Sequence, residues 1–121
     1  MEPFQQLFVV VLQAGIANGG EFETVPAGKL AVIEHVSVDA TGVASANADY
    51  LIKSTIQDNS TFREVLIVVT KVGALGGVIG SQSVRAFAAP GTQFGAVIRR
   101  LDTAERISAS FVITGHFIPV P

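Results

Sequence analysis

Residues that branch at Cβ dominate this sequence, and glycine and proline interrupt them at short intervals. Val, Ile and Thr make up 35 of the 121 residues, with 12 Gly and 5 Pro between the apolar runs. A branched Cβ restricts χ1 and suits the pleated, half-buried surface of a strand. Because no stretch has the 3.6-residue period of a helix, the pattern predicts an all-β chain with frequent turns.

The predicted strands are the apolar or alternating segments between these turns. The clearest is 30–39, in which the even positions are expected to face inward except for Glu34. Eight or nine short strands predict an antiparallel β-sandwich, and this number favours a jelly roll over the seven-stranded immunoglobulin arrangement. The length fits one domain, so residues 1–121 are expected to form a single β-sandwich. The predicted strands are 5–13, 22–25, 30–39, 50–57, 62–71, 84–88, 92–100 and 107–118.

Turn-forming residues separate these strands. Residues 18–20, with two glycines that tolerate positive φ, are expected to reverse the chain. In residues 25–28, proline at the second position and glycine at the fourth fit a type I turn, and residues 89–91 fit a type II turn. The small, polar segment 41–48 and the glycine-rich segment 73–80 are predicted to be connections.

The chain is poor in charge, which excludes some partners. Charged residues make up 15% of the chain and hydrophobic residues 49%, with a net charge of −2 and a pI of about 5.5. Proteins that bind nucleic acids normally show a basic patch and a high pI, whereas the basic residues here cluster only at Arg99, Arg100 and Arg106. We therefore expect no nucleic-acid partner. The absence of cysteine excludes a disulfide scaffold and a thiolate zinc site.

No segment has the pattern of a membrane span or of a clear signal peptide. The longest uninterrupted apolar run, 7–12, is far below the ~20 residues that a helix needs to cross a bilayer. The N-terminal segment carries Glu2 and has no basic residue before Lys29, which is unlike a secretory leader. We expect no membrane insertion, and we favour a virion or a cell-surface or extracellular location.

Glu34, His35 and His116 are the residues that suggest a ligand or metal site. The alternation places both histidines opposite the main apolar face and Glu34 on that face, pointing away from them. A carboxylate on an apolar face needs a partner, and a β-bulge or an ion pair at a sheet edge accounts for it without a ligand. Because a third metal ligand is missing from this group, we expect no metal and no cofactor.

The sequence contains no pattern typical of an enzyme. A nucleophile elbow, a Walker loop, an HExxH helix and an EF-hand loop are all absent from it. We therefore expect a protein that is not an enzyme. A lectin-like carbohydrate-binding module is the alternative function, although a glycan site has few stacking residues to use. There is no Trp, Tyr50 is the single Tyr, and most of the eight Phe fall on predicted inward faces.

Two segments break the alternation expected of a strand with one wet face. Residues 7–12 and residues 65–69 are apolar at every position, so both faces of these strands need cover. A neighbouring subunit is the simplest cover, which predicts a non-catalytic, self-assembling structural subunit of a capsid, fibre or filament, as a trimer or an open filament. The predicted interface residues are Leu7, Phe8, Val9, Val10, Val11, Leu12, Val65, Ile67 and Val69.

The N-terminal strand has a second way to build an assembly. A glycine-bearing link, 14–21, joins residues 1–14 to the rest of the chain. Such a strand can pair with its own sheet, or it can be exchanged onto the open edge of a neighbour. If it is exchanged, removal of residues 1–14 is expected to abolish the oligomer.

Three short segments carry a resemblance. FETVPAGKL at 22–30, VIEHVS at 32–37 and VITGHF at 112–117 resemble small, uncharacterised bacterial β-sandwich proteins. The resemblance is confined to strand-and-turn segments and implies no catalytic residues. In outline the arrangement is also similar to the jelly-roll subunits of virions and of trimeric TNF-like proteins, which implies assembly at the level of the fold alone.

Overall fold

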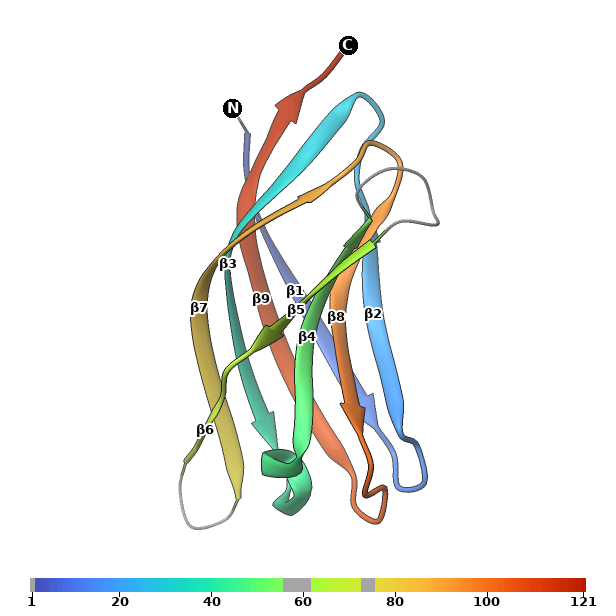
Figure 1. The fold of residues 1–121 in the computed structure, drawn as a ribbon, viewed down its shortest axis with the longest axis vertical. Coiled ribbons are helices and arrows are strands. Elements are labelled where there is room, and N and C mark those ends of the chain that lie inside the picture. Colours follow the sequence, from blue (N-terminus) through green and yellow to red (C-terminus); the bar gives the residue numbers. More distant parts are fainter. Residues whose placement is uncertain (1, 56–61, 73–75) are drawn as a thin grey trace.

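The chain folds into two antiparallel sheets packed face to face, in a computed structural model that describes residues 2–55, 62–72 and 76–121 (Figure 1). The prediction of an all-β antiparallel sandwich is confirmed. The end of predicted strand 50–57 and the residues 73–75 lie outside the described residues. The elements are β1 (Glu2–Leu12), β2 (Asn18–Thr24), β3 (Lys29–Thr41), the 3₁₀ helix η1 (Val43–Asn47), β4 (Ala48–Thr55), β5 (Phe62–Ile67), β6 (Thr70–Lys71), β7 (Gly77–Ala88), β8 (Gln93–Arg100) and β9 (Ile107–Pro119).

The strand order is that of a jelly roll. The five-stranded sheet has the order β1-β9-β3-β7-β6, and the four-stranded sheet has the order β2-β8-β4-β5. Because β6 follows β5 after only two residues, the two act as one bent strand that crosses between the sheets (Figure 1). Each sheet then has four long strands, and strands from the start and the end of the chain lie side by side, as in a double Greek key.

The core lies between the sheets and is built from alternate residues of the long strands. Tyr50, Phe94 and Phe111 are among its largest fully buried side chains. The ring of Phe94 meets that of Phe8 edge to face, with 6.0 Å between the centroids. Burial of one such apolar side chain contributes about 1.5–3 kcal/mol, so this layer is the main source of stability.

β3 contains a bulge that changes which residues face the core. Its register with β7 and β9 shifts between Ile33 and His35. Ala31 and Ile33 belong to the core before the shift, and Val36 belongs to it afterwards. The prediction that the even residues other than Glu34 face inward is therefore wrong for the first half of this strand. Relative to β9, the extra residue at the shift is Glu34, whereas relative to β7 the extra residue belongs to β7.

Two predicted turns are displaced by a few residues, and a third is confirmed. Residues 18–20 begin β2, and the chain reverses earlier, at a turn that contains Gly15 with φ +90°. The next turn starts at Pro26, whose carbonyl accepts a bond from the Lys29 amide, so proline is its first residue rather than its second. The type II turn at residues 89–91 is confirmed, with Gly91 at φ +75°.

The glycine-rich segment predicted as a connection contributes to a strand. Residues 77–80 begin β7, so the predicted strand 84–88 is only the second half of that element. A Cβ at Gly80 would lie 2.5 Å from the Val68 carbonyl, so glycine lets the bent strand approach β7 closely. The Gln82 amide completes this approach, because it accepts a bond from the Val68 N–H at 3.0 Å and donates one to the Leu66 carbonyl at 3.1 Å.

One end of the sandwich is closed by a buried arginine. The Arg100 guanidinium donates hydrogen bonds to the backbone carbonyls of Gln13, Ile16 and Glu105. The first two carbonyls belong to the β1–β2 connection and the third to the β8–β9 connection. Arg100 therefore ties two loops to the end of β8.

A buried tyrosine lies near this end. The Tyr50 hydroxyl donates to the Ser45 carbonyl at 2.7 Å. Burial raises the pKa of Tyr50 to about 12, although the positive charge of Arg100 and the bond to Ser45 act in the opposite direction. The neutral hydroxyl is therefore the form that the fold favours.

Candidate assembly surface

β1 forms one edge of the five-stranded sheet. It pairs with β9 of the same chain in an unbroken register from Glu2 opposite Phe117 to Leu12 opposite Ile107. Its second edge has no neighbouring strand among the described residues. The single chain thus pairs its N-terminal strand with its own sheet, and exchange of that strand with a neighbour stays a prediction.

The side chains of β1 alternate between the core and the outer face. Leu7, Val9 and Val11 are 58%, 49% and 38% exposed. The remaining predicted interface residues of this segment are buried in the core, so their assignment to an interface is corrected. The reason is the two-residue period of a strand, which turns every second side chain inward. The corrected residues are Phe8, Val10 and Leu12.

The bent strand shows the same alternation. Ile67 is part of the core, and Val65 and Val69 pack against it, so these three predicted interface residues also face inward. The exposed residues are Leu66 and Val68, of which Val68 is 74% exposed. Val68 lines the groove on the outer face of the five-stranded sheet, whereas Leu66 belongs to the four-stranded sheet and faces outward there. Sequence reasoning missed the exposure of both, although the parity opposite Ile67 would have indicated it.

The middle of the outer face of the five-stranded sheet is nearly uncharged, whereas Glu34 and Arg85 are exposed beyond it. Cross-strand pairing places four residues in each of four neighbouring rows that run from β1 through β9 and β3 to β7. Among these sixteen described residues, Asp39 is the only Asp, Glu, Lys or Arg. The rows are Gln5–Thr114–His35–Ser83, Leu7–Val112–Ser37–Ser81, Val9–Ser110–Asp39–Ile79 and Val11–Ser108–Thr41–Gly77.

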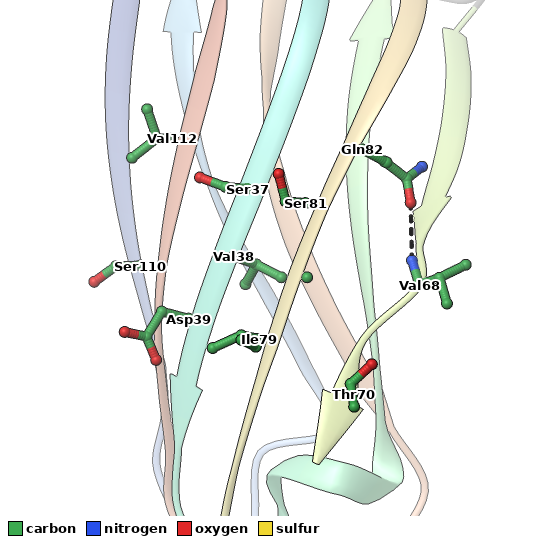
Figure 2. Close-up of a pocket in the computed structure, with 11 residues that line it drawn as sticks. Ser37, Val38, Asp39, Val68, Thr70, Ile79, Ser81, Gln82, Ser110 and Val112 are labelled. Atoms are coloured by element: carbon green, nitrogen blue, oxygen red, sulfur yellow. Dashed lines mark hydrogen bonds between the residues drawn. The ribbon is translucent and has the colours of Figure 1, made fainter. Parts of the chain in front are cut away.

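Small side chains hollow the middle of this face. Figure 2 shows Ser37 and Asp39 on β3, between Ser110 of β9 and the Ile79 and Ser81 side chains of β7. The serines leave an open groove of about 1040 Å³. Apolar side chains border it on both sides, with Val112 of β9 at one margin and Ile79 of β7 and Val68 of the bent strand at the other. The groove can accept a second surface, and its Ser81 hydroxyl lies 3.0 Å from His35 Nε2.

The outer face of the four-stranded sheet is different, because charge is spread over it. Lys53, Glu64 and Arg99 all lie on this face, on β4, β5 and β8. The Arg99 guanidinium donates two hydrogen bonds to the Glu64 carboxylate. This face therefore has the charged surface of an ordinary solvated sheet, in contrast to the five-stranded one.

The three residues predicted for a ligand or metal site do not form one cluster. His116 Nδ1 lies 2.6 Å from the Glu34 carboxylate, because the bulge in β3 turns Glu34 toward β9. The prediction that Glu34 points away from the histidines is therefore wrong. His35 Nε2 instead lies 3.0 Å from the Ser81 hydroxyl. Within the described residues, no group of three or more His, Cys, Asp or Glu is arranged to hold a metal ion.

No protein-family model and no curated protein matches this chain. Among the described residues, no helix has the length and apolar character needed to cross a membrane.

Proposed function

We propose that this protein is a non-catalytic structural subunit that assembles with copies of itself through the β1 edge of the five-stranded sheet. The observation that carries the proposal is the row of exposed Leu7, Val9 and Val11 on a strand whose second edge is open. A strand of this kind presents unpaired backbone groups together with apolar side chains, and both are satisfied by another strand.

Beyond Glu2 and Pro3 at its start, β1 lacks the features that usually protect an edge strand. It contains no lysine or arginine, and its register with β9 has no bulge. No charged residue occurs between Glu2 and Glu21. Two copies can therefore pair their β1 strands about a twofold axis without bringing like charges together at the centre of the contact.

The nearly uncharged outer face supports further growth of the assembly. A β1–β1 contact joins two five-stranded sheets and uses the same patch of both copies, so it closes a dimer. The serine-lined groove beside it provides a second contact that builds dimers into a shell, a fibre or a filament. The proposal includes a location in a virion or at a cell surface, where jelly-roll subunits of this kind assemble.

The test is the molar mass in solution by light scattering, with the wild-type chain expected at a multiple of 12.6 kDa. Val9→Lys places a charge at the centre of the exposed row without touching the core, and we expect it to be monomeric. Leu66→Lys, on the outer face of the other sheet, is the matched control and keeps the assembly. Removal of residues 1–14 is unsuitable because it also deletes the core residues of β1.

Circular dichroism of each variant establishes that the sandwich is intact, and Leu7→Lys serves as a second variant if Val9→Lys does not fold. A wild-type mass of 12.6 kDa at every concentration would remove the basis of the proposal. An assembly that survives both Leu7→Lys and Val9→Lys would exclude the β1 edge as its contact.

A further inference from the structure

The outer face of the four-stranded sheet carries a second depression, on the side of the sandwich away from the proposed assembly surface. It has a volume of about 580 Å³, which is within the range of small-molecule sites. Cross-strand pairing sets Phe22 opposite Gly95, and Gly95 opposite Lys53, so these three residues form one row across the sheet. The lining residues are Phe22, Thr24, Lys53, Thr55, Phe62, Gly91 and Gln93.

Phe22 lies flat on this face because two glycines make room for it. A Cβ at Gly95 would lie 2.7 Å from Cδ1 of the ring, and a Cβ at Gly20 would lie 3.2 Å from Cε2. Cδ1 and Cε2 are opposite corners of the ring, and the two glycines belong to neighbouring strands. The ring therefore spans both strands and leaves one side toward the depression, with the residue 40% exposed.

At the other side of the depression, the ring of Phe62 contacts the positively charged Lys53. The Lys53 ammonium lies 4.0 Å from the centroid of the Phe62 ring, which is a cation–π contact. Glu64 is the cross-strand neighbour of Lys53, but its carboxylate is engaged by Arg99. Within the described part of the chain, no carboxylate forms an ion pair with Lys53.

We propose that this depression binds an acidic carbohydrate, with one sugar ring stacked on Phe22 and a sugar carboxylate on Lys53. The C–H face of a pyranose ring is apolar and flat, so it matches the exposed side of Phe22. Hydroxyls of Thr24 and Thr55 and the amide of Gln93 lie in the lining between the two aromatic residues and suit sugar hydroxyls. The charge-assisted contact with Lys53 selects an acidic sugar over a neutral one.

The probes are an oligosaccharide of galacturonic acid, a neutral galactose oligosaccharide of the same length, and inorganic sulfate alone, each titrated by calorimetry into the full chain. The acidic oligosaccharide is expected to bind about fivefold more tightly than the neutral one, the contribution of one exposed ion pair. Inorganic sulfate that binds as tightly as the acidic oligosaccharide would overturn the proposal in favour of a simple anion site.

Three variants separate the parts of the site. Phe22→Leu keeps the two glycines covered but removes the aromatic ring. It is expected to weaken the binding of both oligosaccharides by about fivefold. Lys53→Met is expected to make the two affinities equal, and Lys53→Arg to restore the preference. Lys71→Met, the same charge change on β6 of the other sheet, is the matched control and leaves both affinities unchanged.

Two results would overturn the proposal. One is the absence of heat from either oligosaccharide at millimolar concentration with the folded wild-type chain. The other is a preference for the acidic oligosaccharide that persists in Lys53→Met. Neither result bears on assembly, because the depression and the β1 edge belong to different sheets.

Discussion

The imidazole Nδ1 of His116 lies 2.6 Å from Oε1 of Glu34, at the one place where the register of β3 is irregular. The bulge gives β3 one extra residue relative to β9, and that residue carries the carboxylate. Its side chain leaves the alternation of the strand and reaches the neighbouring strand β9. Two residues that look like ligands in the sequence are thus a structural pair that stabilises a bulge.

The first prediction concerns the energy of this pair. Glu34 is exposed and His116 is only partly buried, so solvent screens their attraction. A double-mutant cycle with Glu34→Gln and His116→Asn is expected to give a coupling of less than about 1 kcal/mol in urea unfolding. A coupling above about 2 kcal/mol would show that the pair contributes more than a surface contact.

The second prediction compares two adjacent arginines. Arg100→Met leaves the carbonyls of Gln13, Ile16 and Glu105 without their donor, and it is expected to lower the free energy of unfolding by about 2–4 kcal/mol. Arg99→Met removes only an exposed ion pair with Glu64, and its expected cost is less than about 1 kcal/mol. Chemical denaturation of both variants provides the comparison, and equal costs would contradict the role given to Arg100.

The third prediction is a loss of stability in alkali. The pKa of Tyr50 is about 12 in the folded chain against 10.0 for a free tyrosine, so the unfolded chain loses this proton first as the pH rises. The contribution of this pKa shift to the free energy of unfolding is fully present below pH 10 and is lost between pH 10 and pH 12. Thermal unfolding across this range measures it.

Tyr50→Phe is the control for this pH dependence. The variant keeps the ring in the core but removes the ionisable hydroxyl, so its stability is expected to fall less steeply over the same range. At neutral pH it loses the bond to the Ser45 carbonyl, at a cost of about 1 kcal/mol. A wild type and a variant with identical alkaline profiles would contradict the assignment.

Local patterns in the sequence predict most of the fold, but only three of the nine predicted interface residues, Leu7, Val9 and Val11, face outward. Ile107, Phe111 and Ile113 of β9 are separated by even numbers of positions and all belong to the core, because one strand in one register has one parity. The same rule applied to residues 7–12 places Val9 and Val10 on opposite faces of the strand. In a run in which every residue is apolar, however, the sequence does not indicate which of the two faces is buried. Only the packing of β1 against the opposite sheet shows which of these side chains face outward.

An all-β sandwich with glycine and proline turns follows from the sequence alone, because β-branching and turn propensity are local properties. The tertiary structure decided the jelly-roll order, the bulge at Glu34 and the sites on the two outer faces, because each depends on which strands become neighbours. Phe22 and Lys53 are 31 positions apart in the chain and share one cross-strand row only because both flank Gly95. Such a juxtaposition arises from strand pairing and has no local signal in the sequence.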